Sequence, residues 1–313
     1  MSTTTPMSLS RNAAAWAAIG ALLFFAGGIR ADTQINSVTV EAQRERKALE
    51  HQVDAFVFSV IVRHTDDNEG LARWNEPICP FVDGLLEEQS KFVMARLAAI
   101  AASAGARLGA ESCRPNFYVV ATPEPDQFLK RWYARDPKMF NHLHGRAPLK
   151  SFLTTPRPVR VWYNRDFASG DGLPAMDQPL QLAGGTPGTG ATATAENTYP
   201  VIQLHTPGGT RLAWDGVQNL SLVIAVIDTT RIKNLSVGQL ADYVSMVGLA
   251  EVHLDARVGA PSILQLFNAA ADSLPHGLSS WDEAFLKSVY DTNQRSVVQL
   301  QNIEERMTDA LAH

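Results

Sequence analysis

Two carboxylates and a histidine stand out in one apolar stretch of the C-terminal third. The residues from Gln239 to about His253 are apolar nearly all round, which is typical of a buried helix. Asp242 and Glu251 interrupt this stretch, and His253 and Asp255 alternate with Glu251 at its end. Carboxylates and an imidazole in this arrangement could supply general acid–base catalysis. The alternative for residues 251–255 is a solvated helix end without a catalytic role.

The spacing along this helix also matches a zinc-binding signature, H-E-x-x-H-x-x-G-x-x-H. In that signature two histidines one turn apart bind zinc and the glutamate activates a water molecule. The three histidine positions hold Ala241, Ser245 and Glu251, the glutamate position holds Asp242, and the glycine is Gly248. We therefore expect no bound metal, no cofactor and no zinc-dependent catalysis. A core helix with a few satisfied polar groups would give the same pattern.

Four segments carry a resemblance to a known group of proteins. They are residues 71–78 (LARWNEPI), 114–120 (RPNFYVV), 262–267 (SILQLF) and the run from Leu278-Ser-Ser-Trp-Asp282 to Tyr290. Together they resemble a family of uncharacterised secreted bacterial proteins that is distantly similar to metzincin-type zinc peptidases. The resemblance covers most of residues 55–292 and implies a zincin-like fold. It does not carry over the peptidase activity, because the helix motif has lost its metal ligands.

Other ligand and nucleophile patterns in the chain are weaker. His142 and His144 form an H-x-H pair in an expected loop, but no third metal ligand accompanies them, and exposed loop histidines are the alternative. The sequence contains no G-x-S-x-G, no phosphate-binding loop and no G-x-G-x-x-G. These absences leave a hydrolase using Asp242 and Glu251 as the enzyme hypothesis.

The two cysteines, Cys79 and Cys113, predict a disulfide. An even number of cysteines in an exported chain is typical of a bridge, and the alternative is two buried free thiols. Neither cysteine lies in a C-x-x-C motif or beside a histidine cluster, so the sequence favours a structural role over a redox or zinc-binding role.

The first 31 residues read as a secretory signal peptide. Arg11 precedes an uncharged, mostly apolar run over residues 13–28, and small residues lead to an expected cleavage between Ala31 and Asp32. The alternative is an uncleaved membrane anchor, although 16 residues fall short of the roughly 20 that span a bilayer. We expect a periplasmic or secreted protein that contacts the membrane only if the signal is retained.

The remaining pattern predicts one α+β domain over residues 55–292. Strands are expected at 55–63, 116–122, 159–163 and 220–228, and helices at 85–104, 126–134, 239–253 and 280–290. Capping boxes are expected at 236–239 and 280–283, Gly105 as a C-cap, and turns over residues 74–84. Residues 32–54 read as a polar linker or exposed helix, 169–198 as a mobile loop, and 293–313 as an amphipathic C-terminal helix.

Composition narrows the functional classes. The formal net charge is −5 and no basic stripe is present, so nucleic-acid binding is not expected.

The sequence leaves three hypotheses about function. The first is an exported non-catalytic binding protein that recognises an envelope component or another exported protein. The second is the carboxylate hydrolase, and the third is a structural envelope protein that docks through its C-terminal helix.

Overall fold

The computed structural model describes residues 28–62, 71–140, 146–169, 216–270, 273–294 and 298–312. The chain divides into two units, Met1–Ala48 and Leu49–His313. Helix α1 (Gly28–Val60) begins in the first unit, where residues 40–48 are exposed. The expected cleavage point after Ala31 lies within α1, and cleavage there stays a prediction. The loop expected over residues 169–198 lies outside the described residues, except for Ser169.

The last turns of α1 replace the first expected strand. The prediction of a strand from residue 55 is wrong, because the chain is helical as far as Val60. Val53, Phe56, Val57 and Val60 are buried, and their spacing of three, one and three residues is that of one helix face. The run of apolar residues concealed this period because the exposed face carries Phe58.

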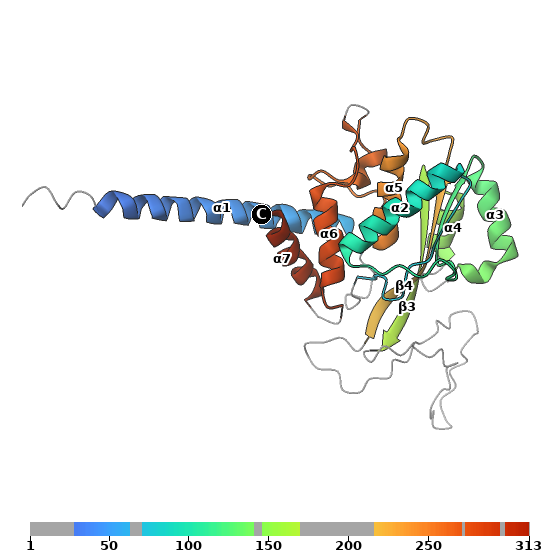
Figure 1. The fold of residues 1–313 in the computed structure, drawn as a ribbon, viewed down its shortest axis with the longest axis horizontal. Coiled ribbons are helices and arrows are strands. Elements are labelled where there is room, and N and C mark those ends of the chain that lie inside the picture. The colour runs from blue at the N-terminus through green and yellow to red at the C-terminus, as the bar shows by residue number, and fades with distance from the viewer. Residues whose placement is uncertain are drawn as a thin grey trace, which may run out of the picture. The chain divides into compact units, whose positions relative to one another are not determined.

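Four strands form one mixed sheet in the order β1-β2-β4-β3 (Figure 1). β1 (Pro80–Asp83), β2 (Phe117–Thr122) and β4 (Gly216–Asp228) are parallel, and β3 (Val159–Ser169) pairs antiparallel with β4. The expected α+β class is confirmed. β1 lies in the stretch predicted as turns, where two prolines and a glycine masked a strand of only four residues.

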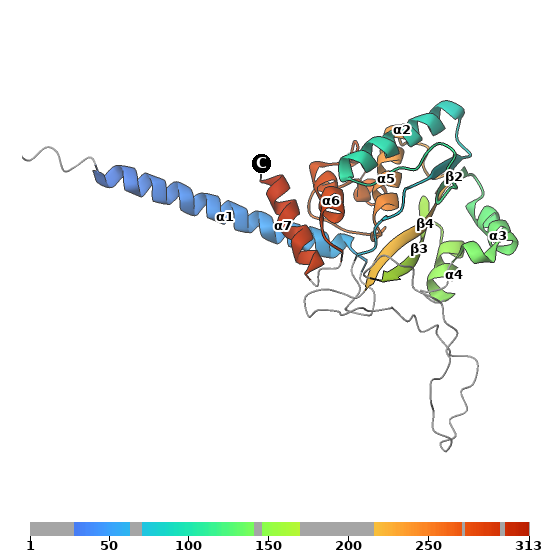
Figure 2. The ribbon, with the colours of Figure 1, turned by 60° about the horizontal axis from the view of Figure 1, so that its bottom comes forward.

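Helices cover both faces of this sheet (Figures 1 and 2). α2 (Glu87–Ala104) and α5 (Val237–Leu249) lie on one face, where α6 (Ser280–Asp291) packs against α2 and α7 (Gln299–Leu311) against α6. α3 (Pro125–Arg135) and α4 (Arg146–Thr154) lie on the other face. Two short 3₁₀ helices, η1 (Pro137–Met139) and η2 (Ile263–Phe267), complete the described helices.

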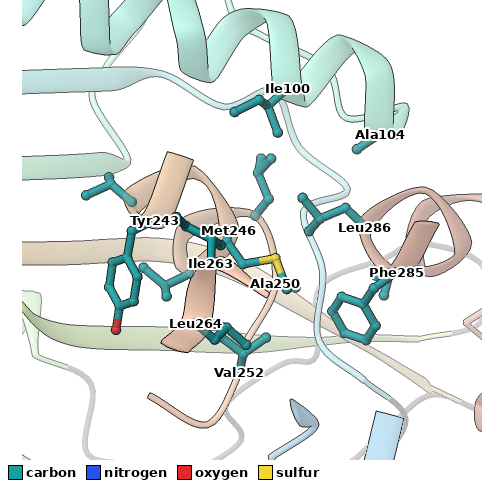
Figure 3. Packing of buried hydrophobic residues seen from close by; sticks show 14 of the residues in the cluster. Ile100, Ala104, Tyr243, Met246, Ala250, Val252, Ile263, Leu264, Phe285 and Leu286 are labelled. Carbon is teal, nitrogen blue, oxygen red and sulfur yellow. The ribbon is translucent and has the colours of Figure 1, made fainter. Parts of the chain in front are cut away.

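Each face has its own hydrophobic core. The larger core joins α1, α2, α5, α6 and α7, and Figure 3 shows Met246 of α5 between Ile263 and Leu264 of η2 and Phe285 of α6. The smaller core, under α3 and α4, is mainly aromatic and includes Trp132, Phe140 and Trp162. The sheet is therefore buried on both sides, which explains the continuous apolar run of β4.

Several helix ends differ from the sequence prediction. α5 ends at Leu249, four residues before the expected end at His253, although its capping box at 236–239 is confirmed. The second capping box uses Ser279 and Asp282, one residue earlier than predicted, and α7 begins only at Gln299. Gly105 ends α2 as expected, with a left-handed φ of 93° that favours glycine.

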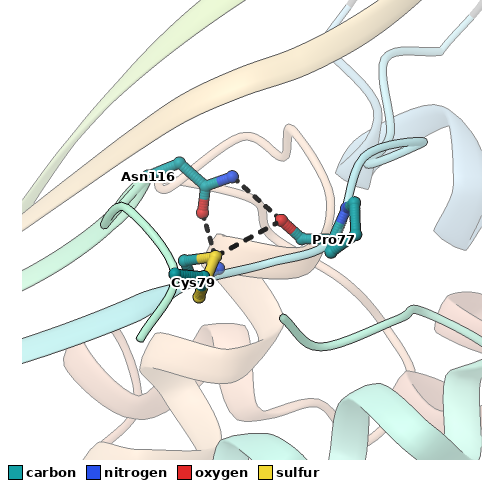
Figure 4. Close-up of a disulfide and its surroundings, with 4 residues drawn as sticks. Pro77, Cys79 and Asn116 are labelled. Carbon is teal, nitrogen blue, oxygen red and sulfur yellow. Dashed lines mark hydrogen bonds between the residues drawn. A yellow bond between two sulfur atoms is a disulfide. The ribbon is translucent and has the colours of Figure 1, made fainter. Parts of the chain in front are cut away.

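The predicted disulfide between Cys79 and Cys113 is present, with Cα atoms 5.9 Å apart. It joins the start of β1 to the loop before β2 and so closes the β1-α2-β2 unit. Asn116 supports it (Figure 4), because its Oδ1 accepts the Cys79 N–H at 2.7 Å and its Nδ2 donates to the Pro77 carbonyl at 3.1 Å. A side chain at Gly109 would place its Cβ 2.5 Å from the Cys79 sulfur, so glycine is required there.

Candidate functional site

Asp242 lies in the second turn of α5, and its carboxylate accepts three hydrogen bonds from protein groups. The side chain is only 5% exposed. Arg96 of α2 donates from Nε to Oδ1 at 2.5 Å and from Nη2 to Oδ2 at 3.0 Å, and the backbone N–H of Leu278 donates to Oδ2 at 2.9 Å. A Cβ on Gly277 would lie 2.6 Å from Oδ2. The carboxylate therefore joins α2, α5 and the segment before α6, and backbone covers it.

The other positions of the zinc-like pattern on α5 are packed into the core. Ala241 and Ser245 have no exposed surface, and the Ser245 hydroxyl donates to the Ala241 carbonyl one turn earlier at 2.7 Å. Gly248 faces β2, where an added Cβ would lie 2.0 Å from Cζ of Phe117. Close packing of helix on sheet accounts for this glycine without any metal site.

The C-terminus of α5 is capped by side chains from three different elements, which the sequence did not indicate. Tyr163 of β3 donates to the Val247 carbonyl, the Trp74 indole to the Gly248 carbonyl, and Tyr290 of α6 to the Leu249 carbonyl, each at 2.7 Å. These three carbonyls belong to the last turn and lack partners within the helix. Burial raises the pKa of both tyrosines, so their hydroxyls remain protonated donors.

Glu251 lies beyond the end of α5 and contacts a different set of residues from Asp242. Its Oε2 lies 3.6 Å from Nε of Arg165 on β3, and both side chains are buried. Arg165 also donates from Nη1 to the Gln218 side chain at 2.7 Å. The two carboxylates of the hydrolase hypothesis thus have different basic partners, Arg96 and Arg165, and neither arginine bridges them.

His253 and Asp255 point to the surface and do not join Glu251. His253 is exposed, and its backbone N–H donates to the Val60 carbonyl at 2.8 Å. Asp255 forms a two-pronged pair with Arg157, at 2.5 and 2.6 Å. The Arg157 guanidinium holds the pKa of the Asp255 carboxyl below its usual range. Glu251 therefore lies inside the domain, whereas His253 and Asp255 lie at its surface.

A buried carboxylate that sequence reasoning missed is Asp282. It accepts hydrogen bonds from the Ser262 hydroxyl at 2.5 Å, the Ile263 N–H at 2.8 Å, and the N–H and hydroxyl of Ser279, both at 2.9 Å. Burial raises its pKa, and these donors partly offset that effect. Asp282 caps the starts of η2 and α6 together, so its acceptors are used for structure. The capping-box spacing of Ser279 and Asp282 is the sequence signal that could have identified this carboxylate.

One cavity lies at the carboxyl ends of β1 and β4, near the start of α5. Its volume is about 230 Å³, and it is lined by Leu85, Gln89, Thr229, Ile232, Lys233, Leu235, Ser236, Val237 and Leu240. Ligands of open α/β sheets bind outside the carboxyl ends of the strands. No sequence motif indicated this cavity, because its lining comes from two distant segments of the chain, residues 85–89 and 229–240.

Across the described ranges, no three His, Cys, Asp or Glu side chains gather closely enough to hold an ion, and the His142–His144 pair lies outside those ranges. None of the described helices combines the length and apolar character required to cross a bilayer. Comparison of the chain with protein-family models, with curated proteins and with solved structures finds no match in any of the three.

Proposed function

We propose that this chain is an exported, non-catalytic binding protein of the bacterial envelope, with a metalloprotease-like fold that has lost its zinc site. The observation that carries the proposal is the burial and hydrogen bonding of Asp242, which stands at the glutamate position of the helix pattern. Its two oxygens accept three hydrogen bonds from Arg96 and Leu278. A general base must reach a water or substrate proton, whereas the Asp242 side chain is only 5% exposed.

The residue types at the ligand positions support the same reading. Zinc takes nitrogen, thiolate or carboxylate ligands, and Ala241 and Ser245 supply no imidazole. Both have their surfaces buried among core residues. Glu251, at the third position, is paired with Arg165.

Export is supported by the N-terminal pattern of residues 1–31 and by the disulfide. Disulfides persist in oxidising compartments such as the periplasm and are rare in the cytosol. Cleavage after Ala31 is part of the proposal, and the intact mass of the protein recovered from the envelope fraction tests it. A species that retains residues 1–31 would favour the membrane-anchor alternative.

The structural-protein hypothesis required a free apolar face on the C-terminal helix. α7 instead buries Ile303 and Met307 in the same core as α5 and α6. Because this face is already covered within the domain, the helix offers less surface for docking, and we favour a binding role for the domain surface.

The test is metal content and peptidase activity of the full chain, purified without a metal-affinity column. We expect no stoichiometric zinc and no chelator-sensitive peptidase activity, in the wild type and in Asp242→Asn alike. One zinc per chain, together with a chelator-sensitive activity that Asp242→Asn abolishes, would establish the hydrolase instead.

The stability of matched variants gives a second readout. Asp242→Asn should lower the free energy of unfolding by about 2 kcal/mol, because Arg96 loses its charged partner, although solvent screens its half-exposed guanidinium. Asp255→Asn is the control, since it also breaks a two-pronged arginine pair but at an acid that is 71% exposed. It should cost less than about 1 kcal/mol. Equal effects would contradict a structural role for Asp242.

A further inference from the structure

We propose that the cavity between the starts of α2 and α5 binds a small carboxylic acid with a short apolar chain. The cavity includes neither Asp242 nor Glu251. It would supply the ligand site of the binding role proposed above, yet it does not depend on the absence of catalysis. The inference rests on the chemistry of the lining, its charge and its size.

The lining combines five aliphatic residues with four polar or charged ones. Leu85 precedes α2, Ile232 and Leu235 lie in the turn after β4, and Val237 and Leu240 belong to the first turns of α5. All five are aliphatic, and Leu240 is itself buried in the main core. These side chains offer a short alkyl chain an apolar surface on one part of the lining, and the polar residues can engage a polar end group.

The polar part of the lining includes two groups that can donate a hydrogen bond to a ligand. Oε1 of Gln89 accepts the Leu86 N–H at 3.2 Å, which leaves its amide NH₂ to donate. The Thr229 backbone N–H donates to the Thr122 carbonyl at 3.1 Å, while its hydroxyl has no partner among the described residues. Ser236 is already occupied with Gln239 in the capping box. Two neutral donors therefore remain for a ligand.

The charge of the cavity is positive. Lys233 is the only charged residue of the lining, and within the described residues no ion pair engages its ammonium. The nearest acid along the chain, Asp228, is occupied by Arg231 at 3.1 Å and by Thr230. An ammonium beside two neutral donors suits a carboxylate, which has two acceptor oxygens and one negative charge.

The volume of the cavity suits a small ligand. About 230 Å³ corresponds to about eight water molecules at roughly 30 Å³ each. It is below the range of drug-sized pockets, about 300–1,000 Å³. A branched acid of about eight non-hydrogen atoms, such as 4-methylpentanoate, fits this space with its chain on the leucines and its carboxylate at Lys233.

The experiment compares three probes that share one apolar chain. Binding of 4-methylpentanoate, 4-methylpentanamide and 4-methylpentylamine to the full chain is followed by the methyl NMR signals of Leu85, Leu235 and Leu240. We expect the carboxylate to bind at least about fivefold more tightly than the neutral amide, and the amine not to bind. Absence of shifts at these methyl groups with all three probes would overturn the proposal, as would an amide that binds as well as the acid.

Two variants separate the charge from the apolar lining. Lys233→Gln should weaken the carboxylate about fivefold and leave the amide unchanged, whereas Leu235→Ala should weaken both probes alike. Lys130→Gln, an exposed lysine on α3 across the sheet, is the matched control and should change neither. If Lys130→Gln weakens the acid as much as Lys233→Gln does, the attraction is only the general charge of the protein and the proposed site is wrong. Neither result bears on zinc content, so this proposal and the proposed function can fail separately.

Discussion

Removal of the Cys79–Cys113 disulfide should cost the domain a defined part of its stability. The bridge joins residues 34 positions apart and restricts the unfolded chain accordingly. In the chain-entropy model, a loop of that length contributes about 3.8 kcal/mol at 25 °C. For a domain of more than 200 residues, each kcal/mol corresponds to about 2 °C, so the melting temperature should fall by about 8 °C.

The assay is denaturant unfolding of the oxidised protein, the reduced protein, and a double variant with Cys79→Ala and Cys113→Ala. The reduced protein is the matched control for the variant, since it keeps both sulfur atoms. Both should lose about 3–4 kcal/mol. A loss below about 1 kcal/mol in both would refute the loop-entropy reasoning, and two free thiols without reductant would refute the bridge itself.

A substitution at Gly109 tests the same bridge through steric contact with its sulfur atoms. In Gly109→Ala the new Cβ would lie 2.5 and 2.6 Å from the two sulfur atoms, so the bridge must shift. The substitution should destabilise the oxidised protein by about 1–3 kcal/mol and the double alanine variant by much less. Equal losses in both backgrounds would show that Gly109 is needed for some other reason.

Two further predictions concern α5 and its partners. Gly248→Ala should destabilise the domain by about 1–3 kcal/mol, because its Cβ would meet the Phe117 ring. Phe117→Leu should relieve part of that loss. Unfolding of the single and double variants measures both effects. Burial raises the pKa of Tyr163, Tyr243 and Tyr290, so their contribution to stability is complete below the unfolded pKa near 10 and is lost as the pH rises above it. Absorbance at 295 nm should show these three phenols ionising only with unfolding, and their titration in the folded protein would contradict the burial argument.

Local signals predicted much of the fold. Residues 117–122 and 220–228 are apolar and β-branched, and both form strands. The Ser236–Gln239 box and Gly105 mark helix ends as expected. β1 was missed because its four residues begin with Pro80 and closely follow Pro77. Its pairing with β2 depends on residues 37 positions further along the chain. Sequence periodicity contains no information about such distant partners.

The candidate site shows the same limit. Asp242 was identified as an exceptional residue in an apolar helix, and its burial follows from that pattern. Its partner Arg96 lies 146 positions earlier, on a face of α2 that reads as solvent-exposed. The cavity could not be predicted for a similar reason, since its lining combines residues 85–89, around the start of α2, with residues 229–240, which lead into α5.

Because α5 is apolar nearly all round, its few polar residues stand out in the sequence and resemble a functional site. Burying α5 leaves its orphan backbone groups and any side-chain charge away from water, and each must find a partner within the domain. Ser236 and Gln239 serve the N-terminus, and Trp74, Tyr163 and Tyr290 serve the last three carbonyls. Asp242 in turn provides the anchor that holds Arg96 and the Leu278 backbone against the helix. The acid, the serine and the glycine of the zinc-like pattern thus each have a role in packing this helix, so their presence does not require a catalytic function.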